Sequence, residues 1–220
     1  MLTLVPTPVG NLKDITLRAL EVLKASDVIL AEDTRKTRIL LNHYEIKQPC
    51  ESYHAHNEHA KTASLVKRME EGQKMALVTD AGTPAISDPG FLLVRAAIKA
   101  GIEVDCLPGA TAFVPALVMS GLPADRFAFE GFLPLKGKHG RLERVKDDPR
   151  TLIFYESPHR IGRTLTTMAE ILGGARQVAI VREISKIYQE TRRMTLEEAA
   201  RTIEDESIKG EIVLVVEGRP

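Results

Sequence analysis

Short apolar runs alternate with helix-like stretches through the first half of the chain. The runs at residues 2–5, 28–31, 75–79 and 104–107 have the length and composition of buried strands. Between them, apolar residues recur at helical spacing, as in the polar-faced segment 58–71, which ends at a glycine. This alternation predicts βαβ units and a largely parallel sheet.

The pattern changes in the second half, where strand-like runs follow one another more closely. Strands are predicted at 127–132, 151–155, 177–183, 187–193 and 211–217, and helices at 161–172 and 196–203. Two of these strands are separated only by the residues around Ser185 and Lys186, which predicts a mixed sheet with at least one antiparallel pair. The turn-rich segment GLPAD separates the halves, so we expect two α/β domains at 1–121 and 126–220.

Three apolar runs of the first half end in turns that are rich in glycine and proline. The turns are PTPVGNL from Pro6, DAGTPAISDP from Asp80 and PGAT from Pro108. In the second turn, Asp88 followed by Pro89 is typical of a helix N-cap with proline at the first helical position. One such turn is as consistent with a tight connection as with a ligand site. Because the carboxyl ends of parallel strands meet at one edge of a sheet, three of them favour a common ligand site lined by backbone amides.

Composition and charge narrow the class of protein. A hydrophobic content of 44% with 27% charged residues is ordinary for a soluble globular chain, and no apolar run approaches the length of a membrane span. Thirty basic and 30 acidic residues cancel, which argues against a general nucleic-acid coat protein but allows local basic patches. With two cysteines and no basic leader before a long apolar region, we expect a cytoplasmic protein.

Two basic clusters are candidates for contacts with an anionic substrate. The first, AEDTRKTR, places Arg35, Lys36 and Arg38 in the opening turns of an expected helix, where local ion pairs with the preceding acids are the usual outcome. The second, KGKHGR, surrounds two glycines in a segment that we expect to be a mobile loop. Such a loop suits contacts with a phosphate backbone, although many loops of this composition are simply exposed.

Several familiar catalytic and cofactor motifs are missing. The chain has neither the glycine fingerprint of nicotinamide-binding folds nor a P-loop. SYHAHNEH holds three histidines, but no carboxylate or cysteine partner is clearly placed beside them, so we expect no metal site. Ser157 precedes Pro158 as an N-cap does, and no Gly-x-Ser-x-Gly elbow supports a nucleophile.

Several blocks taken together resemble one known family. PTPVGNLKDIT, AEDTRKT, SYHAHNE, VTDAGTPAISDPG, LPGATAFVPALVMSGLP, FEGFLP and FYESPHRI, in this order, are similar to the bacterial small-subunit ribosomal RNA ribose 2′-O-methyltransferases of the RsmI type. That family belongs to the tetrapyrrole methylase superfamily, and the similarity runs from Pro6 to the terminal KGEIVLVVEG. It implies two α/β domains with S-adenosylmethionine in the cleft between them, a cytidine of the small subunit's rRNA as substrate, and a homodimer.

The resemblance also implies a set of cofactor contacts in each half. In the first half these are Pro8, Gly10, Asp80, Ala81, Gly82, Thr83, Ile86, Ser87, Pro108, Gly109, Ala110 and Thr111. In the second half they are Glu130, Phe132, Ser157, Pro158 and Gly210. Backbone amides in such turns can hold the cofactor's polar groups while apolar side chains contact its rings.

The catalytic roles stay open among three acids. We expect Asp80, Glu32 or Asp33 to orient or deprotonate the ribose hydroxyl, because all three lie on strand-end loops beside the cofactor turns. RNA phosphates are expected to be held by basic residues of the two clusters, namely Arg35, Lys36, Arg38, Lys136, Lys138 and Arg141. Two alternatives remain: a methyltransferase of the same superfamily that acts on a small molecule such as a tetrapyrrole, and a non-catalytic RNA-binding module for ribosome assembly.

Overall fold

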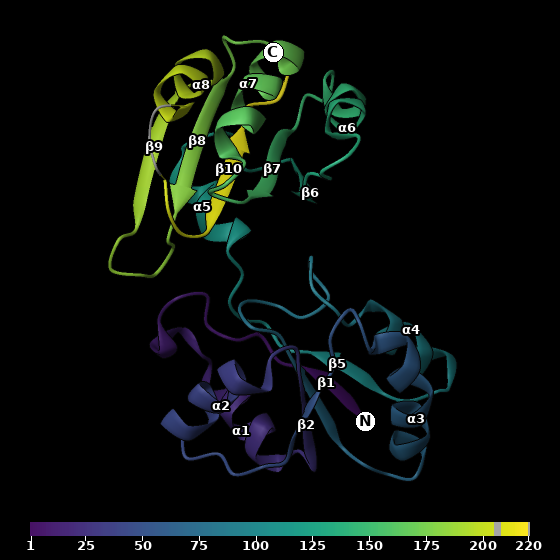
Figure 1. Cartoon of the computed structure of the whole chain (residues 1–220). Helices are drawn as coiled ribbons and strands as arrows, with labels where there is room; N and C mark the ends of the chain where they lie inside the picture. The colour runs from purple at the N-terminus through teal and green to yellow at the C-terminus, as the bar shows by residue number, and fades with distance from the viewer. Residues whose placement is uncertain (205–207, 220) are drawn as a thin grey trace. The chain divides into compact units, whose positions relative to one another are not determined.

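The chain forms two compact units in a computed structural model that describes residues 1–204 and 208–219. Contacts divide it into Met1–Thr111 and Ala112–Pro220 (Figure 1). The helix that follows the division packs on strands of the second unit, so it belongs there, whereas the sequence pattern predicts a boundary at 121–126. The difference arises because GLPAD is only the turn that follows this helix. The packing of the helix, and not the position of the turn, determines which unit the helix belongs to.

The first unit is built on a five-stranded sheet in which every pair of neighbours is parallel. The strand order is β3-β2-β4-β1-β5. The strands are β1 (Leu2–Leu4), β2 (Val28–Ala31), β3 (Cys50–Ser52), β4 (Met75–Val78) and β5 (Val104–Cys106). The helices are the 3-10 turn η1 (Leu12–Asp14), α1 (Leu17–Ala25), α2 (Thr34–His43), α3 (Glu58–Glu70) and α4 (Phe91–Lys99).

Both faces of this sheet are buried, as its continuous apolar strands require. Alternate residues such as Leu30 and Leu77 pack with Leu65 and Leu93, and the intervening residues pack with Leu23 and Leu41. The ribbon accordingly has α1 and α2 on one face of the sheet and α3 and α4 on the other (Figure 1). The prediction of a largely parallel first sheet is confirmed. Because all five strands run in the same direction, their carboxyl ends lie at one edge of the sheet.

Some local predictions for the first unit differ from the structure. The apolar spacing of Phe91, Val94 and Ile98 predicts one buried face for α4, yet Phe91 and Ile98 are each 61% exposed and Leu93 and Ala97 are buried instead. The strand β3 carries no long apolar run and is not predicted. It forms because its backbone pairs with β2 over three residues, a contact that local sequence does not encode.

The second unit contains a mixed five-stranded sheet in the order β6-β7-β10-β8-β9. Its strands are β6 (Phe127–Phe132), β7 (Thr151–Glu156), β8 (Gln177–Arg182), β9 (Glu190–Thr195) and β10 (Ile212–Val216). Its helices are α5 (Phe113–Ser120), α6 (Lys138–Val145), α7 (Ile161–Leu172) and α8 (Leu196–Glu204). Only β6 and β7 are parallel, and β8 and β9 form the antiparallel pair predicted around Ser185 and Lys186.

The core of the second unit lies between its sheet and the helices α6, α7 and α8. Leu165 and Met168 of α7 and Ala199 of α8 are fully buried against sheet residues such as Leu214. The α5 helix packs on the same sheet, where Phe113 stacks on Phe129 with ring centroids 4.7 Å apart. Pro115 lies in the first turn of α5, where its missing N–H leaves no backbone bond unmade, as the sequence predicts.

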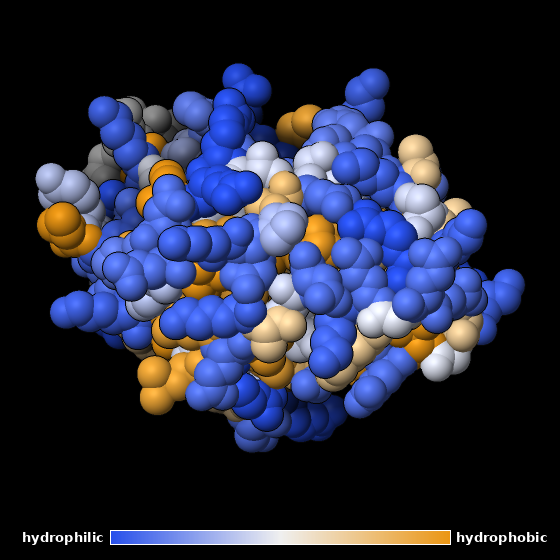
Figure 2. All heavy atoms as spheres, turned by 90° about the horizontal axis from the view of Figure 1, so that it is seen from below, coloured by the Kyte–Doolittle hydropathy of each residue, from blue (hydrophilic) through white to orange (hydrophobic). Residues whose placement is uncertain are grey.

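None of the described helices has the length and apolarity that a bilayer span requires. The face drawn in Figure 2 is mostly hydrophilic, with small separate hydrophobic areas, which agrees with the ordinary composition of the chain.

Candidate functional site

Three turns meet at the carboxyl edge of the first sheet. They follow β1, β4 and β5, which are neighbours in the sheet. Thr7 and Gly82 exchange both backbone hydrogen bonds at 2.9 Å, and Thr83 Oγ1 donates to the Ala110 carbonyl at 3.0 Å. A Cβ atom on Gly109 would lie 2.6 Å from Pro6 Cβ, so the first and third turns touch only because residue 109 is glycine. The predicted convergence of the three turns is therefore present within the first unit.

The second turn is conformationally strained. Ala85 and Ser87 have φ values of 68° and 63°, and Gly90 has 142°. Residues with side chains rarely adopt positive φ, and such positions cluster at binding and catalytic sites. The strain is held by contacts, since the turn is bonded to both neighbouring turns. Predicted cofactor residues Ala81, Gly82, Thr83, Ile86 and Ser87 all lie in this segment.

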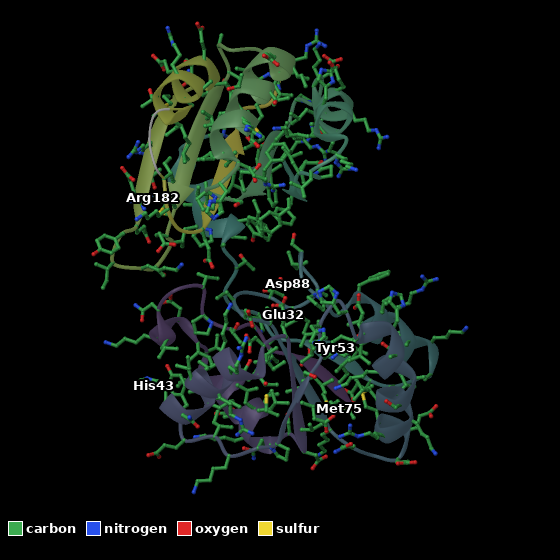
Figure 3. All side chains as sticks on the ribbon, viewed as in Figure 1. Glu32, His43, Tyr53, Met75, Asp88 and Arg182 are labelled. Carbon is green, nitrogen blue, oxygen red and sulfur yellow. The ribbon has the colours of Figure 1, made fainter. Side chains whose placement is uncertain are left out.

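Asp88 does not cap a helix, contrary to its Asp-Pro sequence. The α4 helix begins at Phe91, its N-cap residue is Gly90, and no side chain caps it. Asp88 is instead half-buried and hydrogen bonds with the Thr79 side chain. Figure 3 places Asp88 and Glu32 at the same edge of the first unit, while Met75 at the start of β4 lies at the other end. The sequence signal for a cap is overridden by this tertiary contact.

Thr79 links two carboxylates that come from different strands. Its hydroxyl donates to Glu32 Oε2 at 2.9 Å, and Asp88 interacts with the same side chain. Asp80 lies next to this group, and its Oδ1 accepts from the Asp33 backbone N–H at 3.1 Å. The edge therefore concentrates negative charge where the three turns meet. Neither Asp88 nor Thr79 is a predicted site residue, because their roles depend on β2 and β4 lying side by side.

The carboxylates at this edge differ in proton affinity. Burial raises the pKa of Asp88 from 3.8 to about 6, and the neighbouring charge of Glu32 adds to the rise. In contrast, hydrogen bonds from the exposed Arg35 side chain hold the pKa of Asp33 well below its usual range. A proton acceptor works best with a pKa near the working pH, so the low pKa of Asp33 argues against Asp33 as the base.

The basic residues of α2 are bound to these acids. Asp33 caps the helix by accepting from the Arg35 backbone N–H at 2.9 Å, and its second oxygen pairs with Arg35 Nη2 at 2.8 Å. Lys36 Nζ lies 2.7 Å from Asp80 Oδ2. Arg35 is 89% and Lys36 64% exposed, and exposed pairs of this kind are worth only about 0–1 kcal/mol. An incoming phosphate can therefore compete for both cations. Arg38 lies exposed on the same helix.

The predicted cofactor residues of the second unit also share one sheet edge. The carboxyl ends of β6 and β7 lie there, because Phe132 is in register with Tyr155. The start of β10 lies there too, since Ile212 pairs with Glu156. The edge thus carries the predicted residues Glu130, Phe132, Ser157, Pro158 and Gly210. Gly210 has a φ of 96°, and a Cβ atom there would lie 2.4 Å from the Glu183 carboxylate.

Glu156 is a buried residue whose hydrogen bonds hold this edge together. It is not among the site residues predicted from the sequence. Its carboxylate accepts from the Ser157 backbone N–H at 2.7 Å and from Thr164 Oγ1 at 2.6 Å. Arg160 Nη2 pairs with it at 2.6 Å, which compensates the charge of a side chain that is 1% exposed. Glu156 therefore fixes the turn that carries Ser157 and Pro158.

The second basic cluster is helical rather than a loop. Lys138 and Arg141 lie in α6, and Lys136 is exposed just before it. Lys138 Nζ donates to the Arg163 carbonyl at 3.1 Å, and burial lowers the pKa of this lysine. Arg141 pairs with Glu130 at 2.7 Å, so a predicted RNA contact and a predicted cofactor contact are bound to each other. Packing of Leu142 into the core explains why the glycine-containing segment folds as a helix.

The histidine segment serves the local structure of the first unit. Tyr53 is fully buried, and Asn57 accepts from the His54 backbone N–H at 2.9 Å while its amide nitrogen lies 3.1 Å from His54 Nε2. His54 and His56 contact each other edge to face. Within residues 1–204 and 208–219, no three His, Cys, Asp or Glu side chains are grouped as a metal site requires.

The fold and the edge define a class of α/β protein that holds a ligand on glycine- and proline-containing turns of a parallel sheet. The chain belongs to the family of tetrapyrrole (corrin/porphyrin) methylases, whose family model matches residues 1–200. Solved structures agree at the level of the fold. The methyltransferase CobJ is 20% identical with a TM-score of 0.74, over 99% of this chain and 93% of that one. Diphthine synthase is 14% identical with a TM-score of 0.76, over 99% and 89%.

Relatives of much higher identity carry one name. The protein named ribosomal RNA small subunit methyltransferase I from Halalkalibacterium halodurans is 53% identical over 219 residues, which are 99% of this chain and 75% of that protein. The protein of the same name from Haemophilus influenzae is 49% identical over 230 residues, with 100% and 79% covered. The chain thus spans about three quarters of the length of these relatives.

Proposed function

We propose that the chain is an S-adenosylmethionine-dependent methyltransferase that methylates the ribose 2′-oxygen of a cytidine in small-subunit ribosomal RNA. The observation that carries the proposal is near-complete similarity, at about half of all positions, to relatives named for methylation of that RNA. The convergence of the three turns supports it, because the segments that meet at the edge are the same segments whose sequence resembles the RNA-methylating family.

The edge of the first unit fits the cofactor in shape and in charge. Gly109 allows the first and third turns to touch at Pro6, and Gly82 takes a φ of 85° between these turns. S-adenosylmethionine carries a positive sulfonium and an ammonium group, and Glu32, Asp80 and Asp88 supply negative charge nearby. We propose that the predicted residues of the three turns hold it. The predicted contacts of the second unit remain a prediction.

The cofactor, when bound, supplies a methyl group that the sulfonium already activates, so no metal is required for the transfer. The protein must therefore align the ribose hydroxyl, which can contribute roughly 7–11 kcal/mol. A side chain that accepts the hydroxyl proton adds about 10²–10⁴-fold, equivalent to a smaller free energy. The rigid turns provide the alignment, which is the larger of these two effects. Glu32 or Asp80 accepts the proton, which is the smaller effect.

The substrate RNA requires positive charge near a site that is itself acidic. We propose that Arg35 and Arg38 on α2 bind phosphates, and that Lys36, Lys136, Lys138 and Arg141 contact the RNA as well. To do so, Arg35 must leave Asp33, and Arg141 must leave Glu130. The bidentate geometry of arginine suits phosphate as well as carboxylate.

Mass spectrometry of rRNA nucleosides tests the function directly. Small ribosomal subunits that lack the modification are incubated with the chain and S-adenosylmethionine, and 2′-O-methylcytidine is expected to appear. Methylation of a tetrapyrrole in place of rRNA would support the small-molecule alternative. Calorimetry with S-adenosylmethionine distinguishes the methyltransferase from the non-catalytic RNA-binding module, because such a module has no reason to bind the cofactor at micromolar strength.

We also propose that the chain acts as a homodimer in the cytoplasm. The cytoplasmic location follows from the proposed ribosomal substrate. The homodimer follows from the resemblance to the family. Sedimentation equilibrium tests the dimer, since a mass equal to a single chain at all concentrations would contradict it.

A further inference from the structure

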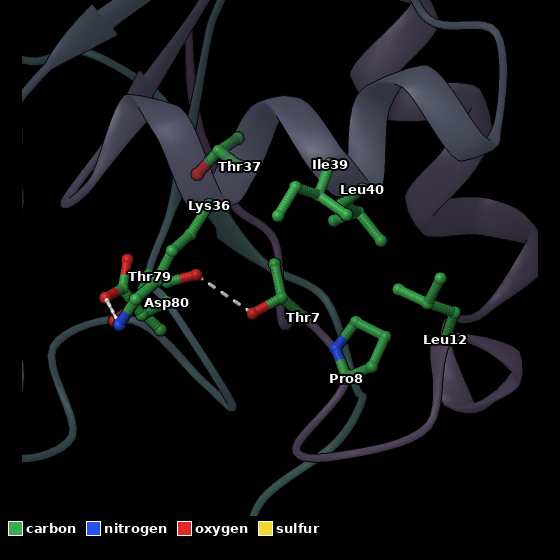
Figure 4. A pocket seen from close by; sticks show the side chains of 9 residues that line it. All are labelled: Thr7, Pro8, Leu12, Lys36, Thr37, Ile39, Leu40, Thr79 and Asp80. Carbon is green, nitrogen blue, oxygen red and sulfur yellow. Dashed lines mark hydrogen bonds and ion pairs between the residues drawn. The ribbon is translucent and has the colours of Figure 1, made fainter.

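A pocket of about 140 Å³ opens at the acidic edge of the first unit (Figure 4). It lies between the α2 helix on one side and the loops after β1 and β4 on the other. The lining residues are Thr7, Pro8, Leu12, Lys36, Thr37, Ile39, Leu40, Thr79 and Asp80. Pro8 and Asp80 also belong to the predicted cofactor turns, so the pocket adjoins the proposed cofactor site on its α2 side.

One part of the pocket wall is apolar. Ile39 and Leu40 on α2 lie across the pocket from Pro8 and Leu12, which belong to the segment after β1 (Figure 4). Leu40 is a core residue with 6% exposure, but Ile39 is 66% exposed. The core does not require an isoleucine at this position. Apolar side chains on two sides of a narrow space suit the faces of a flat ring.

The other part of the wall is polar and charged. The ion pair of Lys36 and Asp80 stands at one end of the pocket, with the Thr7 hydroxyl donating to the Thr79 carbonyl at 3.0 Å beside it (Figure 4). An ammonium and a carboxylate side by side present donors next to acceptors. The edge of a nucleobase has the matching pattern of adjacent acceptors and donors, and carboxylates accept from the amino group of cytosine.

The volume of the pocket is close to that of a single ring. A cavity of about 150 Å³ takes up one benzene molecule. The open pocket, at about 140 Å³, therefore has room for one six-membered ring.

We propose that this pocket binds the pyrimidine ring of the nucleotide that is methylated. The inference rests on the proposed function and adds to it the position of the substrate base. Ile39 contacts a face of the ring, and Lys36 and Asp80 contact its polar edge. Unstacked bases in single-stranded parts of a structured RNA can be splayed out, and proteins hold such bases by stacking on their faces and by hydrogen bonds to their edges.

Binding of free nucleotides tests the pocket without any rRNA. The full chain is labelled with 13C in the isoleucine δ-methyl groups, and cytidine 5′-monophosphate or adenosine 5′-monophosphate is titrated in. We expect the Ile39 signal to shift with the cytidine nucleotide and much less with the adenosine nucleotide. Ile98, which is 61% exposed on α4, is the internal control and is expected not to move.

The same experiment gives the outcomes that overturn the proposal. Equal shifts with both nucleotides, or no shift of Ile39 with either, contradict a pyrimidine pocket. A shift of Ile39 by S-adenosylmethionine, without one by the cytidine nucleotide, assigns the pocket to the cofactor. Nucleotide binding as expected, with no methylation of rRNA, leaves the pocket intact and removes the proposed function instead.

A pair of matched variants tests the pocket in the reaction. Because Ile39 is exposed, Ile39→Ala is expected to fold, to keep its affinity for S-adenosylmethionine within about two-fold, and to lower kcat/KM for small subunits by about 10- to 100-fold. Ile98→Ala removes the same atoms from an equally exposed position and is expected to keep kcat/KM. If the two variants behave alike, Ile39 does not contact the substrate and the proposal fails.

Discussion

Asp88 lies in an environment that changes its proton affinity. Its pKa rises from 3.8 to about 6 because burial and the charges of Glu32 and Asp80 disfavour the ionised form. The folded protein therefore binds this proton more tightly than the unfolded chain does. The unfolding free energy falls as pH rises between about 4 and 6, and the loss persists at neutral pH.

We predict that Asp88→Asn is more stable than the parent chain at about pH 7.5. The amide removes an unfavourable buried charge, so the difference is expected to shrink as pH falls and to vanish below about pH 3, where Asp88 is protonated in both states. Urea unfolding at several pH values measures it. Asp105→Asn, at an exposed position in β5, is the control for the loss of one carboxylate from the surface. A destabilised Asp88→Asn at neutral pH would contradict the prediction.

The three acids proposed for catalysis are separable by substitution. We expect Glu32→Ala or Asp80→Ala to lower kcat by about 10²–10⁴-fold if that residue accepts the ribose proton. Asp33→Ala is expected to have a smaller effect, because Arg35 keeps the pKa of Asp33 low and the carboxylate serves the α2 cap. Single-turnover rates with saturating cofactor are the measurement. Near-native rates in all three variants exclude a side-chain base among them.

At the scale of elements, the strained turn after β4 depends on glycine at its end. A Cβ atom at Gly90 would lie 3.0 Å from Leu77 Cδ2 and 3.1 Å from Ala85 Cβ, at a φ of 142°. We predict that Gly90→Ala costs about 2–5 kcal/mol of unfolding free energy, from the positive φ together with overpacking. Gly72→Ala, with a φ of 99° and open space, is the matched control and is expected to cost about 1–2 kcal/mol. Equal losses in urea unfolding would show that sterics contribute nothing at Gly90.

Gly109 joins the first and third turns. In Gly109→Ala the new methyl group overlaps Pro6, at 2.6 Å from its Cβ and 2.9 Å from its Cγ, so the two turns must move apart. We predict a loss of S-adenosylmethionine affinity of about ten-fold or more, the equivalent of about 1.4 kcal/mol, measured by calorimetry. Gly140→Ala, in the open space of α6, is expected to keep the affinity of the parent. Unchanged binding in Gly109→Ala would remove this pair of turns from the cofactor site.

At the scale of the whole molecule, the net charge of zero makes RNA binding depend on local clusters. We predict that Arg38→Ala weakens binding to small subunits and reduces the slope of log K against log salt by about one, because one phosphate contact is lost. Filter binding over a range of salt concentrations measures the slope. Lys99→Ala removes one exposed positive charge at the end of α4 and serves as the control. The same slope in both variants would contradict a phosphate contact by Arg38.

Much of the fold could be predicted because local pattern and tertiary structure agree. The helix Ile161–Leu172 and most strands match their predicted bounds to within two residues, since their apolar periodicity is also their packing face. The β9 strand begins three residues later than predicted, after the exposed Ile187 and Tyr188. Periodicity could not separate an apolar hairpin tip from a strand, because both are short apolar runs.

The sequence by itself determined the class of fold, the three turns and the family, because these depend on the order of residue types along the chain. Only the tertiary structure decided that Asp88 faces Thr79 rather than capping a helix, that Lys36 pairs with Asp80, and that Ile39 lines a pocket. Each of these depends on strands β1, β2 and β4 being neighbours. That order is fixed by packing between segments far apart in the chain, for which local sequence carries no signal.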